Sequence, residues 1–134
     1  MNRALLCSAI ERLASSSGYN FQLDNEGRYP TTLCRYPTAF MTQPKFVSLE
    51  GRQHGRITYE VTLRLAQTGA KLAPSERNAM LSRMESEAME LFIDLSREKS
   101  VAVVDKLTIS TLPEVVDAHG ALAIEAKAQI TTIF

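Results

Sequence analysis

The chain has 134 residues, of which 45% are hydrophobic and 22% are charged. This length and composition are typical of one globular domain with its own hydrophobic core, so we expect a single domain over residues 1–134. Fifteen basic and fifteen acidic side chains give a formal net charge of zero. Nucleic-acid binding is therefore unlikely on charge grounds, because no basic excess is available to neutralise phosphates, whereas self-association is tolerated.

The cysteine content and the N-terminal segment predict a cellular location. Cys7 and Cys34 are too few for a disulfide framework and too widely spaced for a metal site, so we expect reduced thiols in a reducing compartment. The N-terminal segment carries Arg3, Glu11 and Arg12 among periodic apolar residues, which is typical of an amphipathic helix and not of a signal peptide. No apolar run reaches transmembrane length, so no membrane partner is expected.

The first predicted elements are a helix and two extended segments. Asn2 is the expected N-cap of the helix, and Gly18 ends it in a left-handed conformation. The helix has an apolar stripe made of Leu5, Leu6, Ala9, Ile10 and Leu13. A half-buried strand follows over 19–23, then a turn over 24–27 and an extended stretch over 31–41. Because Pro30 and Pro37 flank or interrupt that stretch, we expect it to be broken or to lie at a sheet edge.

The middle of the chain combines an irregular segment with a clear strand. Pro44, Gly51 and Gly55 interrupt residues 42–55, which we interpret as a long flexible connection or hairpin arm at about 42–56. Residues 57–65 then alternate strictly between apolar and polar side chains. This pattern predicts an antiparallel strand with one buried and one wet face.

A second, longer helix is predicted after that strand. Ser75 is the expected N-cap, Glu76 suits the positive end of the helix dipole, and the helix is expected to end near Lys99. Its apolar stripe comprises Met80, Leu81, Met84, Ala88, Leu91, Phe92 and Leu95. We interpret the methionines of this helix as core filler and not as a soft binding face.

The C-terminal third predicts a long β-hairpin with its turn at 117–120. Its first strand places Val101, Val103, Leu107 and Ile109 on one face, and its second alternates from Leu122 to Phe134. Strict alternation would also put Asp105 on the apolar face of the first strand. We interpret Asp105 as the mark of a bulge, a partner of a basic residue or a subunit contact, in preference to a catalytic carboxylate.

Together these elements predict an α+β fold: a mixed, mainly antiparallel curved sheet with two helices packed on one face, in the order α-β-β-β-α-β-β. No spacing of His, Cys, Gly or Ser matches a zinc site, a phosphate-binding loop or a nucleophile elbow. A nucleophilic Cys34 lacks an orienting third group. We therefore predict no enzyme, no cofactor, no metal and no catalytic residue.

Two segments carry a family resemblance: Tyr36-Pro-Thr-Ala-Phe-Met41, and, after a long connection, the strand Arg56-Ile-Thr-Tyr-Glu-Val-Thr-Leu-Arg-Leu65. With the first helix, the second helix and the closing hairpin, their order resembles the tail-terminator and tail-completion proteins of long-tailed bacteriophages. The resemblance covers most of the chain. It implies a homo-oligomeric ring, commonly a hexamer, that contacts the tail tube and the head–tail connector, and that passes from the cytoplasm during assembly into the virion tail.

The candidate subunit or partner contacts are Lys45, Phe46, Arg52, His54, Arg56, Asp105, Ile130 and Phe134. Head–tail joining and minor tail proteins share this size and order, so the resemblance does not separate them from tail terminators. One alternative is a small-molecule-binding or enzymatic α+β domain with a pocket between the second helix and the sheet. A further alternative is a toxin–antitoxin or chaperone-like interaction module.

Overall fold

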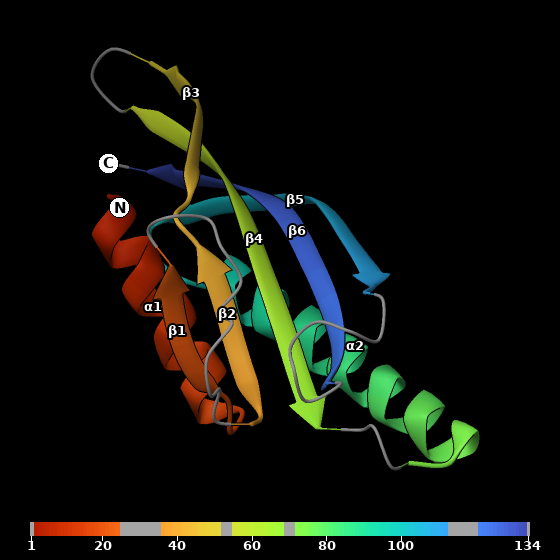
Figure 1. Cartoon of the computed structure of the whole chain (residues 1–134). Coiled ribbons are helices and arrows are strands. Elements are labelled where there is room, and N and C mark those ends of the chain that lie inside the picture. Colours follow the sequence, from red (N-terminus) through yellow and green to blue (C-terminus); the bar gives the residue numbers. More distant parts are fainter. Residues whose placement is uncertain (1, 25–35, 52–54, 69–71, 113–120, 134) are drawn as a thin grey trace.

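The computed structural model describes residues 2–24, 36–51, 55–68, 72–112 and 121–133 (Figure 1). Its elements are α1 (Arg3–Ser16), β1 (Asn20–Asp24), β2 (Thr38–Thr42), β3 (Lys45–Glu50), β4 (Arg56–Thr68), α2 (Pro74–Ser96), β5 (Val101–Thr111) and β6 (Ala121–Ile133). The expected α+β class is confirmed. The described chain has one strand more than the expected order, because β3 forms inside the segment interpreted as a flexible connection or hairpin arm, and it pairs with β4 as the hairpin-arm alternative predicted.

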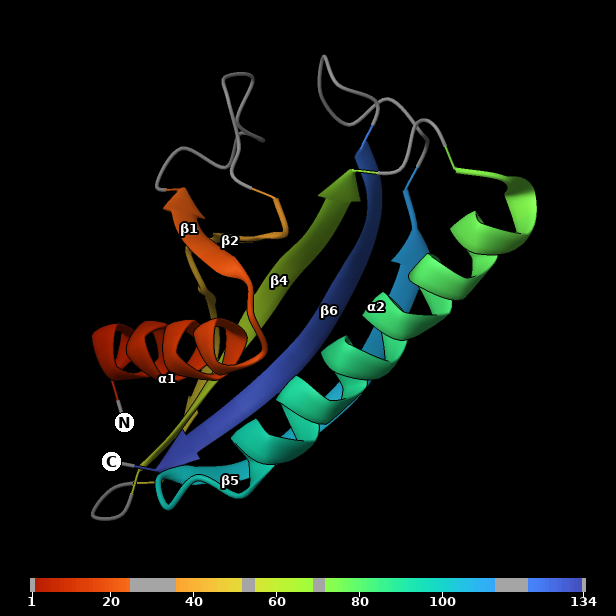
Figure 2. The same cartoon turned by 90° about the horizontal axis from the view of Figure 1, so that it is seen from below.

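The described strands form one mixed sheet in the order β1-β2-β4-β6-β5, with β3 paired to β4 beyond the end of β2. Only the β1–β2 pair is parallel among these strands. Both helices cover the same face of the sheet, and α2 follows the line of β6 (Figure 2). The core lies between this face and the helices, where Leu63, Ile124 and Ile130 are fully buried together with Phe92 and Leu95.

The alternation predicted for β4 and β6 is confirmed. The two strands stay in register from Arg56↔Ile133 to Thr68↔Ala121. Odd-numbered residues of β4, such as Leu63, therefore share the helix-covered face with even-numbered residues of β6. On the opposite face the pairs are polar: the Thr58 and Thr131 hydroxyls lie 2.9 Å apart, and Arg64 Nε donates to Glu125 Oε2 at 2.8 Å.

The structure confirms the expected start and end of α1 but changes its buried stripe. The Asn2 side chain accepts a hydrogen bond from Leu5 N at 2.9 Å, and Gly18 has a φ of 90°. Leu5 was expected on the apolar stripe, but it is 56% exposed. The buried positions of the helix are instead Leu6, Cys7, Ala9, Ile10 and Ala14.

The predicted N-cap of α2 was wrong, and the helix ends slightly before Lys99. The helix begins at Pro74 with Ala73 as N-cap, and it ends at Ser96. Proline suits the first helical position because its missing N–H has no intrahelical partner there, so Ser75 lies inside the helix and does not cap it. Met84 is fully buried core filler, as expected, whereas Met89 is exposed.

Two strands also differ from expectation. The extended stretch over 31–41 was expected to be broken or to lie at a sheet edge. Its described strand, β2, begins just after Pro37 and lies between β1 and β4, so the edge alternative was wrong. In β5 the pairing with β6 is irregular between Val101 and Val103 and again between Asp105 and Thr108, which turns Val103 outward. Asp105 is exposed at the second irregularity, so its interpretation as a bulge is confirmed. The predicted turns at 25–27 and 117–120 lie outside the described residues.

Candidate interaction surface: the β3–β4 arm

A two-stranded arm, made of β3 (45–50) and the first part of β4 (56–60), projects beyond the helices (Figure 1). The N-terminal end of α1 and the C-terminal end of β6 lie at the same end of the molecule in both cartoon views. Within the described chain, β3 pairs with β4 alone. Residues 56–60 of β4 also pair with residues 129–133 of β6, so only β3 lacks a strand on its other edge among the described residues.

The register of the arm sorts its side chains onto two faces. Phe46 pairs with Tyr59 and Leu49 with Ile57, on the face that the helices cover elsewhere in the sheet. A register irregularity between Phe46 and Ser48 accommodates Val47. The rings of Phe46 and Tyr59 meet edge to face, with centroids 6.1 Å apart. We call this apolar side the inner face of the arm.

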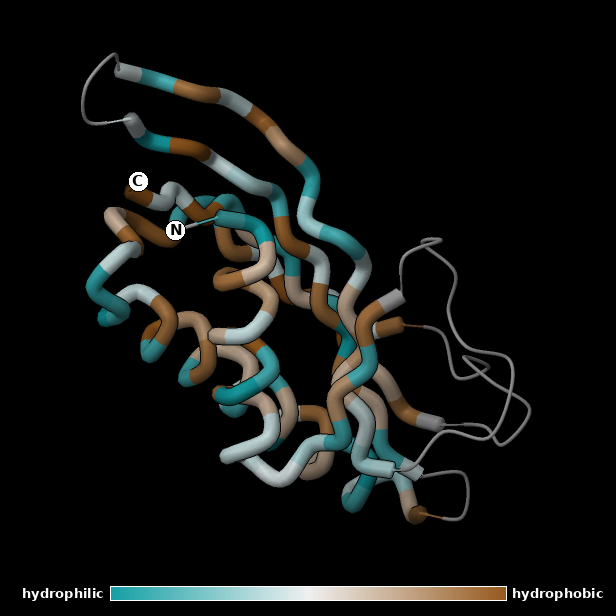
Figure 3. Tube along the Cα trace, turned by 90° about the vertical axis from the view of Figure 1, so that its left-hand side faces the viewer, coloured by the Kyte–Doolittle hydropathy of each residue, from teal (hydrophilic) through white to brown (hydrophobic). Residues whose placement is uncertain are grey.

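The described chain covers the inner face unevenly: Tyr59 on β4 is buried in the core, whereas the apolar side chains of β3 are exposed. Phe46 and Leu49 are each 55% exposed, and hydrophobic segments run along both strands of the arm (Figure 3). At its base, the Arg3 guanidinium lies 5.9 Å from the centroid of the Tyr59 ring, so α1 reaches only the beginning of this surface. Clustered exposed apolar side chains of this kind mark interaction surfaces.

The structure brings together some of the predicted contact residues. Lys45, Phe46 and Arg56 lie on the arm and are exposed. Asp105 is exposed on β5, at the far edge of the sheet. Arg52, His54 and Phe134 lie outside the described residues.

Ile130 was also predicted to be a contact residue, and this was wrong. It belongs to the helix-facing set of β6 and is fully buried within the single chain. Leu49 belongs to the inner face but was missing from the predicted contacts. Its apolar character was the available signal, but strict alternation would place Phe46 and Leu49 on opposite faces, and only the irregularity at Val47 brings both to one face.

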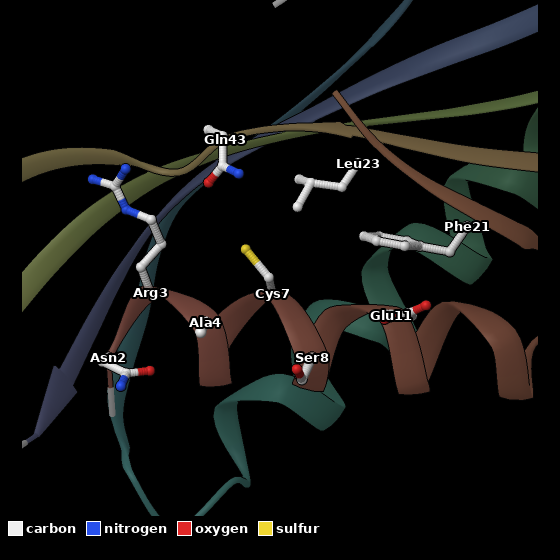
Figure 4. Close-up of a pocket in the computed structure, with 9 residues that line it drawn as sticks. All are labelled: Asn2, Arg3, Ala4, Cys7, Ser8, Glu11, Phe21, Leu23 and Gln43. Carbon is white, nitrogen blue, oxygen red and sulfur yellow. The ribbon is translucent and has the colours of Figure 1, made fainter. Parts of the chain in front are cut away.

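A groove of about 690 Å³ runs between α1 and β1 (Figure 4). Cys7, Phe21 and Leu23 point into it, and Arg3 and Gln43 line the end nearest the arm. Burial is the main cause that raises the pKa of the Cys7 thiol, and it outweighs the opposing effect of Arg3. Cys7 is therefore a protonated thiol at neutral pH, and it is free and buried, whereas the sequence predicted only that it is reduced.

Tyr19 is the second titratable group with a clear shift. It is buried where α1 leads into β1, and its hydroxyl is hydrogen-bonded to Glu87 on α2. Burial first, and then Glu87, raise its pKa well above the ordinary value of 10.0. Tyr19 thus links the end of α1 to α2 as a neutral phenol.

Among the described residues, no group of three or more His, Cys, Asp or Glu side chains could hold a metal ion. None of the described helices combines the length and apolar character needed to cross a bilayer.

Comparison with known proteins neither supports nor contradicts the resemblance to tail proteins. No protein-family model matches the chain. No curated protein sequence matches it significantly.

Proposed function

We propose that the chain is a structural protein of a phage or prophage tail, acting as a tail terminator or head–tail joining protein that assembles as a ring of identical subunits. The observation that carries the proposal is the arm, whose apolar inner face projects beyond both helices. A projecting surface of this kind is suited to covering by a neighbouring subunit. The element order that suggested the family supports the same role.

The proposed ring needs a heterologous contact, in which one surface of a subunit meets a different surface of the next. The inner face of the arm supplies one such surface through Phe46 and Leu49. The groove beside α1 is a candidate for the other, because Phe21 and Leu23 give it an apolar lining. The two surfaces belong to different strands of the sheet, so one subunit can use both at once.

Sedimentation velocity and negative-stain electron microscopy of the full chain test the proposal. Both are performed on the protein alone and after co-expression with the products of its neighbouring genes. We expect closed rings of uniform size, and tail-tube and tape-measure genes beside this one. A strict monomer under both conditions, in a neighbourhood without tail genes, would contradict it. Phe46→Ser, with Val103→Ser as an exposed control on β5, should weaken ring formation selectively.

A second candidate is small-molecule binding, and the groove beside α1 is the observation that favours it. The pocket was expected between α2 and the sheet, but Met84, Leu91 and Phe92 fill that interface. Ligand-detected NMR with a fragment library distinguishes this candidate. Fragments that bind should lose affinity when Phe21→Ser alters the groove.

A further inference from the structure

The free edge of β3 is a different surface from the inner face of the arm. One edge of β3 pairs with β4, and the described chain places no strand on the other edge. An unpaired edge exposes backbone N–H and C=O groups that can pair with another strand. A strand that pairs with this edge must match the charges and apolar residues of the sequence Lys45-Phe46-Val47-Ser48-Leu49-Glu50.

The irregularity at Val47 decides which side chains share a face. Lys45 lies opposite Glu60 and Glu50 opposite Arg56, and both partners are even-numbered residues of β4. Lys45 and Glu50 therefore share the outer face, although they are five positions apart. In a regular strand that spacing would place them on opposite faces, so the extra residue aligns the two charges.

The same irregularity aligns the apolar residues. Phe46 and Leu49 lie opposite Tyr59 and Ile57 on the inner face. Read from either end, β3 thus presents a charged residue on the outer face and then an apolar residue on the inner face. Its two ends carry opposite charges, so the strand is complementary to itself when it is reversed.

We infer that β3 pairs in antiparallel orientation with β3 of a second copy of this chain, about a twofold axis near Val47 and Ser48. Lys45 then faces the partner's Glu50 on the outer face, and Phe46 faces the partner's Leu49 on the inner face. Both contacts occur twice because the interface is isologous. Opposite charges and apolar pairs directly across two strands stabilise such a pairing.

Other arrangements of the same edges are less favourable. Parallel pairing in register would set Lys45 against the partner's Lys45, and Glu50 against the partner's Glu50, and like charges across strands are destabilising. A shift of one residue in the antiparallel register would place inner-face residues opposite outer-face residues. Charge and face together therefore favour one register.

This inference is independent of the proposed ring. A twofold contact closes on itself and gives a dimer, whereas a ring needs a heterologous contact elsewhere on the subunit. The dimer uses the edge of β3, and the ring was assigned to the inner face and the α1 groove. The presence of one assembly therefore does not require the other.

A charge-exchange experiment on the full chain tests the pairing. Lys45→Glu places acidic residues at both ends of β3, and Glu50→Lys places basic residues at both ends, so each variant repels its own copies. In an equimolar mixture every facing pair is again of opposite charge. By sedimentation velocity we expect each variant alone to dimerise about tenfold more weakly than the native chain, and the mixture to recover most of that loss.

The mixture also controls for effects inside the subunit. Each substitution disturbs a pair within the arm, with Glu60 or with Arg56, but this disturbance is the same alone and in the mixture. Lys127→Glu is the matched control, because it makes the same charge change at an exposed position on the interior strand β6 and should leave dimerisation unchanged. Circular dichroism and thermal unfolding establish that each variant is folded.

The outcomes separate the two proposals. A native chain that stays monomeric up to about 1 mM, or a mixture no tighter than either variant alone, overturns the pairing of β3. Rings that form equally well in all variants, without any charge-dependent dimer, leave the proposed function standing and overturn the dimer. A charge-dependent dimer without rings in any condition supports the dimer and counts against the proposed function.

Discussion

The β5–β6 pair and the β3–β4 arm are both antiparallel strand pairs with apolar residues on one face, but they differ in what covers that face. In the terminal hairpin, α2 lies on the inner face and Phe92 packs against it at 1% exposure. In the arm, the corresponding face carries Phe46 at 55% exposure, because neither described helix extends that far. Apolar residues line one face of both strand pairs, but they are buried only where a described helix covers that face.

The free edges of the two hairpins differ as well. Two irregularities interrupt the edge strand β5, and the second exposes Asp105 and Lys106. Bulges and charges on an edge discourage pairing with other chains. The single irregularity of β3 has the opposite consequence, since it brings Lys45 and Glu50 to one face. A register irregularity thus discourages strand pairing at the edge of β5, whereas it makes the edge of β3 self-complementary.

The largest expected effect comes from making the same substitution in both environments. Phe92→Ala leaves a cavity under the terminal hairpin and should lower the free energy of unfolding by about 3–5 kcal/mol. Phe46→Ala removes an exposed ring and its edge-to-face contact with Tyr59, and should cost about 1 kcal/mol or less. Urea denaturation followed by circular dichroism measures both values. Equal losses at the two positions would show that the arm is covered within the single chain.

A smaller, pH-dependent effect is expected where the two helices of the body are joined. The folded state raises the pKa of Tyr19, so it holds the phenol proton more tightly than the unfolded chain does. The contribution of Tyr19 to the free energy of unfolding is fully present below pH 10.0, the pKa of Tyr19 in the unfolded chain, and is lost as the pH rises through the higher pKa of the folded state. At neutral pH, Tyr19→Phe should cost about 1 kcal/mol through the lost hydrogen bond to Glu87.

The measurement for Tyr19 is unfolding by urea at pH 7 and at pH 10–11. The gap in stability between the native chain and Tyr19→Phe should narrow in alkali. Cys7, whose pKa is also raised, is present in both proteins and cancels in the difference. The arm variant Phe46→Ala should follow the native pH profile in parallel. An unchanged gap across this pH range would exclude Tyr19 as a source of the alkaline loss.

The sequence predicted the body of the fold better than its interaction surface. The alternation in β4 and β6 and the stripe of α2 are strong local signals, and the structure confirmed them. The sequence left a flexible connection or a hairpin arm open at 42–56 and could not place β3 within it, because Pro44 and the extra residue at Val47 disturb its period and only pairing with β4 restores it. Ile130 was misassigned for a related reason: an apolar residue near a strand end looks the same whether a helix or another subunit covers it.

The smallest expected effect concerns the irregularity in β5. Lys106 has a φ of 53°, a left-handed conformation that costs a side-chain-bearing residue more than it costs glycine. Its backbone N–H donates to Asp105 Oδ1 at 2.8 Å, and Lys106→Gly keeps this hydrogen bond. We expect Lys106→Gly to stabilise the chain by about 0.5 kcal/mol, or about 2 °C in Tm by calorimetry.

Thr108→Gly is the control, at an exposed neighbouring position of β5 without a positive φ. It should instead destabilise the chain by about 0.5–1 kcal/mol. If both substitutions destabilise the chain, then the left-handed conformation of Lys106 is not strained. The bulge would then discourage edge-to-edge pairing of β5 without lowering the stability of the chain.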